Sequence, residues 1–107
     1  MNIYSEKQTG ALKISEDVIV MIAANVIRET QGVYEYFALD PMGIFKTPSI
    51  SARFNNGTVE VTALVNLGYG VKAQAAVESV QKNIKNSIQD MTGIIVSKVN
   101  VKIASLV

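Results

Sequence analysis

The stretch Thr58-Val-Glu-Val-Thr-Ala-Leu-Val-Asn66 decides the fold of this chain. Side chains alternate between the two faces of a strand, so three valines and Ala63 would share one face, opposite Glu60, Thr62 and Asn66. The stretch therefore predicts a strand with one buried face. A glycine-rich junction, a long helical pattern and a second alternating segment follow it.

The helical pattern begins at about Val71, where apolar residues start to recur every three or four positions. The expected buried stripe consists of Ala73, Ala76, Val77, Val80, Ile84, Ile88 and Met91. Gly93 is placed to end this helix, because glycine readily adopts the left-handed conformation that closes many helices. The next segment predicts a strand with an inner face of Ile95, Val99, Val101 and Ile103. Two strands joined by a helix normally lie parallel in one sheet, so this half of the chain predicts a β-α-β crossover.

The first half of the chain predicts one helix and several short strands. Ser15 is a good N-cap, and Glu16 and Asp17 follow it in the first turn, where the helix dipole favours negative charge. The apolar spacing continues to about residue 31, and Gly32 can end the helix. Short strands are expected at residues 10–14, 33–38 and 50–54. The sequence Asn-Asn-Gly at residues 55–57, which ends in Gly57, predicts a hairpin turn into the strand at 58–66.

Each predicted helix carries a single apolar stripe, and the central strands have one apolar face. The simplest packing is an α+β fold of two layers, in which two long helices pack on one face of a mixed β-sheet. Residues 10–107 would form this single domain, after a mobile N-terminus at residues 1–9. The opposite face of the sheet would show Ser51, Arg53, Glu60, Thr62, Leu64, Val96, Lys98, Asn100 and Lys102.

The composition excludes several classes of chemistry. The 107 residues contain no cysteine, which excludes disulfides and thiol catalysis, and no histidine, the usual general base and metal ligand. The net charge of +1 gives no electrostatic footprint for nucleic acid. The longest apolar run, residues 18–24, is too short to insert into a membrane. We therefore expect an intracellular soluble protein without enzymatic activity, cofactor, metal or nucleic-acid partner.

Three places offer candidate functional side chains. The junction Gly68-Tyr69-Gly70 precedes a helix and Lys72 and could hold a phosphate, but it lacks the phosphate-loop spacing, which favours a tight turn. The cations Arg53, Lys98 and Lys102 would lie on the open sheet face; the central strands offer no aromatic residue there for stacking RNA bases, so a solvated or self-associating face is expected. The third place is the apolar pair Ile44 and Phe45, in an expected loop. This pair either folds back on the core or marks a contact surface together with Leu64.

Four stretches together resemble the alkaline-shock-protein and general-stress-protein family of Gram-positive bacteria, also called the envelope stress response family. They are Gly10-Ala-Leu-Lys-Ile-Ser-Glu-Asp-Val-Ile19, Val65-Asn-Leu-Gly-Tyr-Gly70, Val80-Gln-Lys-Asn-Ile-Lys85 and Met91-Thr-Gly-Ile-Ile-Val-Ser-Lys-Val-Asn-Val101. They occur in the family's order and span most of the chain. The matching glycines and Tyr69 are the residues assigned above to turns and caps.

The resemblance implies a small, non-enzymatic cytoplasmic protein that supports cell-envelope homeostasis. Some members are held near the membrane by an anchor protein, and the family has no catalytic residues to carry over. Together with the missing catalytic side chains, this predicts a structural or adaptor protein that acts through protein partners and forms a homo-oligomer. The alternative is a regulator or small-ligand binder of lipid metabolism, which an apolar pocket under the long helix would favour.

Overall fold

The computed structural model describes residues 14–39, 42–43 and 46–107. The predicted N-terminus at 1–9, most of the predicted strand at 10–14, and Ile44 and Phe45 lie outside these ranges. The elements follow in the order α1 (Glu16–Glu29), β1 (Val33–Glu35), β2 (Phe37–Leu39), β3 (Lys46–Pro48), β4 (Ile50–Asn55), β5 (Thr58–Leu67), α2 (Ala73–Thr92) and β6 (Ile95–Leu106).

Strand β5 is the centre of the main sheet. Along one edge it pairs antiparallel with β4 and, further on, with β1. Along the other edge it pairs in parallel with β6, which follows it in the chain after α2. Strands β2 and β3 form a separate antiparallel pair. The α+β class is confirmed, and the predicted single strand at 33–38 is wrong, because the chain leaves the main sheet at Tyr36 and pairs again as β2.

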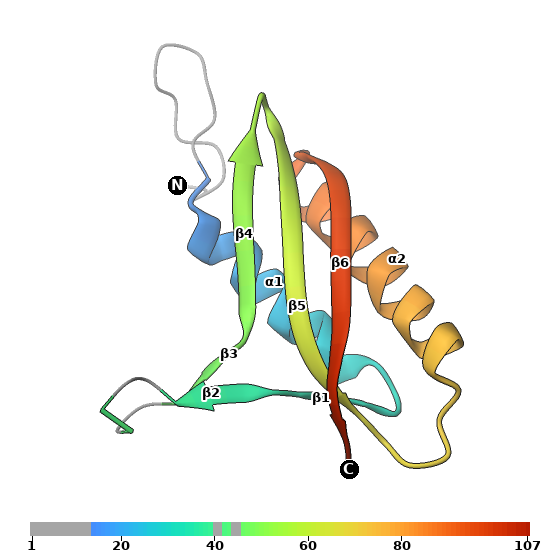
Figure 1. Ribbon diagram of the computed structural model, residues 1–107. Helices are drawn as coiled ribbons and strands as arrows, with labels where there is room; N and C mark the ends of the chain where they lie inside the picture. Colours follow the sequence, from blue (N-terminus) through green and yellow to red (C-terminus); the bar gives the residue numbers. More distant parts are fainter. Residues whose placement is uncertain (1–13, 40–41, 44–45) are drawn as a thin grey trace.

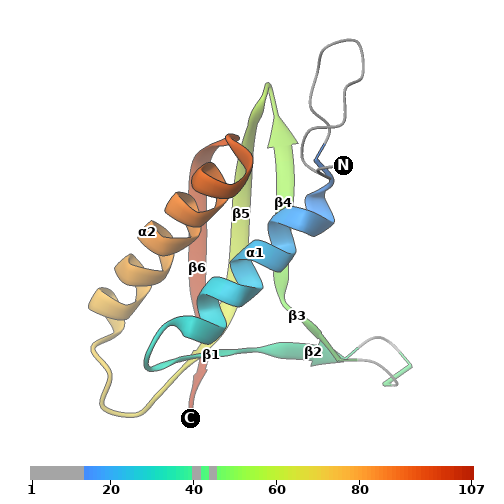
Figure 2. The ribbon, with the colours of Figure 1, turned by 180° about the vertical axis from the view of Figure 1, so that it is seen from behind.

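The two helices lie together on one face of the main sheet, while no helix of the described residues covers the other face (Figures 1 and 2). Helix α1 contacts α2 and β4, and α2 contacts β6. Between the layers, the inner side chains of β5 have 0–2% of their surface exposed. Val80, Ile84 and Ile88 of α2 pack against this face and are fully buried. The alternation of β5 and the period of α2 thus produce a single core.

The turns follow the backbone preferences of their residues. Ser15 is the N-cap of α1 and accepts a hydrogen bond from the Val18 N–H. In the β4–β5 turn, Asn56 and Gly57 have φ angles of 53° and 82°, the pair of positive values that a tight hairpin turn requires. Gly93, with φ of 75°, closes α2 and donates its backbone N–H to the Gln89 carbonyl.

The inner face of β6 differs from its prediction at the start of the strand. Val96 is 3% exposed and packs in the core, whereas Ile95 is 57% exposed. The register passes from Val59 opposite Val96 to Glu60 opposite Lys98, so Ser97 is an extra residue in β6. This bulge shifts the alternation by one position, after which Val99 and Val101 pack against the core as predicted. The prediction is wrong for Ile103, which is 38% exposed.

The buried stripe of α2 also differs at its end. Met91 is 53% exposed, and Thr92 is the buried residue of the last turn. The Thr92 hydroxyl donates to the Ile88 carbonyl at 2.6 Å and accepts from the Ile94 N–H at 3.1 Å, so its polar atom is satisfied. Ala73 is exposed at the first position of the helix. Helix α1 ends at Glu29, two residues before the predicted end.

Two glycines hold the start of β1 against the end of β5. The Gly68 N–H donates to the Gly32 carbonyl at 2.9 Å. Gly32 has φ of 83°, and a Cβ atom there would lie 2.9 Å from a methyl group of Val71. Gly70 also has φ of 83°, but a Cβ atom there would meet nothing within 4 Å. Gly32 is therefore constrained by its conformation and by packing, and Gly70 by conformation alone.

Ile84→Ala should destabilise the protein by about 2 to 5 kcal/mol, because it removes a fully buried side chain from the core. The neighbouring Lys85 is exposed, and Lys85→Ala should cost less than about 0.5 kcal/mol. Urea unfolding measures both losses. Similar losses for the two variants would contradict the assignment of the helix face.

Gly32→Ala should destabilise the protein more than Gly70→Ala. Each variant places a side chain at a positive φ, which costs about 1 to 2 kcal/mol of stability. Gly32→Ala adds a clash with Val71, which costs about 1 to 3 kcal/mol more. Thermal and urea unfolding of the two variants separate these contributions. Equal losses would show that Val71 moves aside without cost.

Candidate functional site

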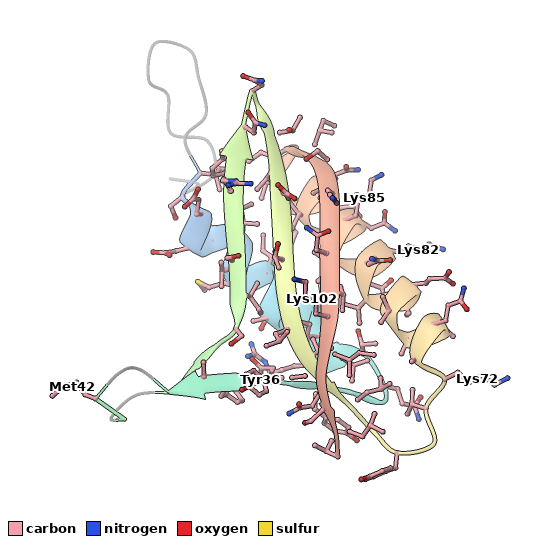
Figure 3. The ribbon with its side chains drawn as sticks, viewed as in Figure 1. Tyr36, Met42, Lys72, Lys82, Lys85 and Lys102 are labelled. Carbon is pink, nitrogen blue, oxygen red and sulfur yellow. The ribbon has the colours of Figure 1, made fainter. Side chains whose placement is uncertain are left out.

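The face of the main sheet that carries no helix is polar and charged. Arg53 of β4, Glu60 of β5 and Lys98 of β6 lie side by side in the sheet register. Further toward the end of β5, beyond the pair of Thr62 and Asn100, Leu64 lies opposite Lys102 on the same face. Of the predicted contact residues, Arg53, Leu64, Lys98 and Lys102 therefore share one face, and Figure 3 shows Lys102 on it. Predicted contact residues Ile44 and Phe45 lie in a part of the chain that the structure does not describe.

Glu60 is the centre of a hydrogen-bond network on this face. Asn100 donates its side-chain amide to one carboxylate oxygen at 3.1 Å and to the Thr62 hydroxyl at 3.4 Å. Arg53 donates to the other carboxylate oxygen at 3.4 Å. Three strands are thus joined through one side chain. The Asn100 hydrogen bond, followed by that of Arg53, lowers the pKa of Glu60 below its ordinary value of 4.5.

A second feature is a set of exposed apolar side chains at one end of the molecule. Tyr69 is 76% exposed, and its backbone N–H donates to the Val107 carbonyl. The Val107 N–H in turn donates to the Leu67 carbonyl, which holds the chain after β6 beside the glycine junction. The ring of Tyr34 lies next to Gly68. We call this set the apolar end; it consists of Tyr34, Tyr69, Leu106 and Val107.

The sequence predicts a turn at Gly68, Tyr69 and Gly70 but does not indicate the apolar end. Its residues come from β1, the β5–α2 junction and the end of β6, so their meeting depends on the sheet pairing. An available signal was the position of Tyr69 between two glycines, because a large aromatic side chain in a tight turn has little around it to pack against.

The described residues contain no group of three or more histidine, cysteine, aspartate or glutamate side chains placed to bind a metal ion. Within the same ranges, no helix has the length and apolar character needed to cross a membrane. Lys72, the N-cap residue of α2, makes no side-chain capping hydrogen bond. On the polar sheet face, Arg53 and Glu60 form an ion pair, and Asn100 donates to Glu60 and Thr62.

Asn100→Ala and Arg53→Gln should each raise the pKa of Glu60 toward its ordinary value, because Asn100 lowers this pKa through a hydrogen bond and Arg53 lowers it through a hydrogen bond and its positive charge. The lowered pKa stabilises the folded protein above the unfolded-state value, and this contribution is lost as the pH falls through the folded-state pKa. Glu60→Gln should therefore weaken the acid-induced loss of stability below about pH 4.5. Carboxyl NMR titration and urea unfolding across this range measure the two effects. An unchanged pKa of Glu60 in both variants would contradict these causes.

A family model matches the chain almost from end to end. Searches among curated proteins and among solved structures found no similar protein. The model is that of the alkaline shock protein family, described as having a cell envelope-related function, and it matches residues 4–107. This match confirms the resemblance that the four sequence stretches indicated. The description names a role at the cell envelope and no catalytic activity. The chain belongs to this family.

Proposed function

We propose that this protein is a non-enzymatic structural or adaptor protein of cell-envelope homeostasis, which acts through protein–protein contacts that include self-association. The envelope-related role rests on the family. The mode of action is supported by one observation, the apolar end. Tyr69 is 76% exposed, and Tyr34, Leu106 and Val107 are each more than half exposed at the same end of the molecule.

Exposed apolar side chains are common singly, but a group of them marks a contact surface. Two of the four residues at this end, Tyr34 and Tyr69, are aromatic, and aromatic residues are enriched in the centres of protein interfaces. The surrounding backbone is fixed by the hydrogen bonds of Tyr69 and Val107. The group is therefore held in one arrangement before binding, which lowers the entropy lost on association.

In this proposal the protein is cytoplasmic, and a membrane-anchor protein is the class of partner that would bring it close to the envelope. Cross-linking in the native cells followed by mass spectrometry tests this directly. Capture of a small membrane protein supports the proposal. Capture of an enzyme of lipid synthesis supports the alternative, a regulator of lipid metabolism.

The alternative, a regulator or small-ligand binder of lipid metabolism, requires an apolar pocket beside the long helix. The groove between α2 and β6 has a volume of about 650 Å³. Its lining includes three lysines and a glutamate, and it is open to solvent. A lipid chain would gain little from such a lining, because the ionic groups would lose hydration on contact with it. The groove therefore favours the adaptor over the lipid-binding alternative.

The double variant Tyr69→Ser with Leu106→Ser should stay monomeric under conditions in which the wild-type protein associates. Light scattering on a sizing column over a wide concentration range measures the mass of both. Met91→Ser is a matched control, because Met91 is 53% exposed and belongs to the opposite end of α2 from the glycine junction. A wild-type protein that is monomeric at every concentration would contradict self-association, and equal association of all variants would exclude the apolar end as its surface.

A further inference from the structure

The outer edge of β6 is open to another strand. β6 runs over twelve residues, and among the strands that the structure describes it pairs with β5 alone. An edge strand presents backbone N–H and C=O groups that have no strand partner. Such an edge can bind an extended peptide, which adds to the sheet through main-chain hydrogen bonds.

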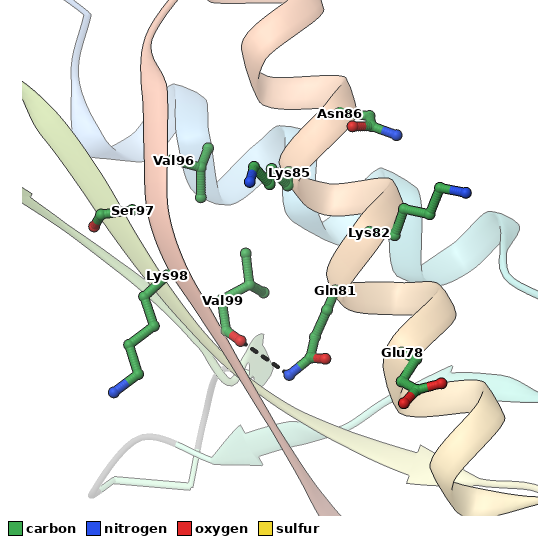
Figure 4. A pocket seen from close by; sticks show the side chains of 9 residues that line it. All are labelled: Glu78, Gln81, Lys82, Lys85, Asn86, Val96, Ser97, Lys98 and Val99. Atoms are coloured by element: carbon green, nitrogen blue, oxygen red, sulfur yellow. Dashed lines mark hydrogen bonds between the residues drawn. The ribbon is translucent and has the colours of Figure 1, made fainter.

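Two side chains of α2 show which backbone groups point outward. Gln81 donates its side-chain amide to the Val99 carbonyl at 3.1 Å, and the Val96 N–H donates to the side-chain oxygen of Gln89 at 3.1 Å. The Gln81 contact lies on the helix side of β6, away from β5 (Figure 4). Because backbone groups alternate along a strand, those of Val101 and Ile103 also point outward. In the described part of the chain no side chain makes a hydrogen bond to these two residues' outward groups.

The open edge adjoins the groove between β6 and α2. Figure 4 shows its lining, with Lys82 and Glu78 on α2, Lys85 directed from α2 toward β6, and Lys98 on the far side of β6. Three lysines against one glutamate give this lining a net positive charge. Val99, which is partly exposed, supplies apolar surface on the helix side. A strand on this edge would thus meet cations on one face, and Val99 with Lys85 on the other.

On its opposite edge, β6 already has a carboxylate of a neighbouring strand beside one of its lysines. On that side Glu60 of β5 lies in register with Lys98, and the charge of Lys98 contributes to lowering the pKa of Glu60. Four residues further along, Lys102 lies on the same face of β6, roughly 13 Å away at about 3.3 Å per residue. Carboxylates spaced by four residues would match this pair of lysines.

We propose that the outer edge of β6 binds an extended acidic segment of a partner protein. The segment carries carboxylates four residues apart, beside Lys98 and Lys102, and β-branched apolar side chains that face α2. Its backbone pairs with Val101 and Ile103. This proposal rests on the adaptor function proposed above and specifies the chemistry of a partner, at a surface separate from the apolar end.

Two copies of β6 would bring like charges opposite one another in one register of this edge. In an antiparallel pair of two β6 strands centred on Asn100, Lys98 of each copy would lie directly opposite Lys102 of the other. Like charges opposite one another destabilise a strand pair. Lys85 of both copies would add further positive charge. The charge on the edge therefore favours an acidic segment over self-pairing.

A labelled peptide tests the proposal with the full-length protein. The probe has the sequence Thr-Glu-Val-Thr-Val-Glu-Val-Thr, and the control peptide has lysine in place of both glutamates. Fluorescence anisotropy at low ionic strength should show at least tenfold tighter binding of the acidic peptide. The preference should shrink as salt is added, and in the double variant Lys98→Glu with Lys102→Glu it should reverse.

The backbone contribution is tested at Val101. Val101→Pro removes an outward N–H, which an edge strand tolerates because this group is not needed for pairing with β5. Val101→Ala changes the same side chain and keeps the N–H. The proline variant should bind the acidic peptide at least tenfold more weakly than the alanine variant. For the wild-type protein, the peptide should shift the amide NMR signals of β6 and α2, which requires no substitution.

Several results would overturn the proposal. The first is equal binding of the acidic and basic peptides, or no binding of either at millimolar concentration. The second is equal binding of the acidic peptide by the proline and alanine variants when both fold. The third is a set of peptide-induced shifts centred outside β6 and α2. Shifts of the β6 amides that depend on protein concentration alone would assign the edge to a second copy and also overturn it. Light scattering of the Tyr69 and Leu106 variant reports on self-association independently, so failure of one proposal is distinguishable from failure of the other.

Discussion

The burial of one face of β5 is the constraint on which the rest of the structure depends. β5 is bordered along both edges, by β4 and β1 on one side and by β6 on the other. Its inner side chains are at most 2% exposed, so a slip of one residue would exchange them for Glu60, Thr62 and the other outward side chains. That exchange would bury charge without partners, which fixes the register of all the neighbouring strands.

The sequence predicted the elements that depend on local pattern and missed those that depend on register. The alternation at 58–66, the stripe through Val80 and Ile84, and the turn at Gly57 are properties of short segments, and the structure contains them. The bulge at Ser97 arises from how β6 meets β5, so its effect on Ile95 and Val96 was not predictable from alternation alone. Thr92 is buried because its hydroxyl finds two backbone partners, a compensation that a hydrophobic period does not reveal.

The candidate surfaces also divide into one that local pattern predicts and one that depends on strand pairing. Arg53, Lys98 and Lys102 were assigned to one sheet face from alternation, and the register brings them there. The apolar end was missed because its members are up to 73 positions apart in the chain, from Tyr34 to Val107. Only the pairing of β1 and β6 with the end of β5 brings these segments together. Alternation along one segment therefore identifies a face, whereas a cluster drawn from several segments requires the topology.

The two irregularities of β6 limit the length of any strand that can join it. Register shifts occur at Ser97 and at Ala104, and each extra residue bends the strand and increases its twist. Between them, six consecutive residues, from Lys98 to Ile103, remain in regular register with β5. At about 3.3 Å per residue this straight part is roughly 20 Å long. An added strand longer than this would diverge from the edge at both ends, so β6 accepts a short segment while resisting the open-ended stacking through which flat edge strands form fibrils.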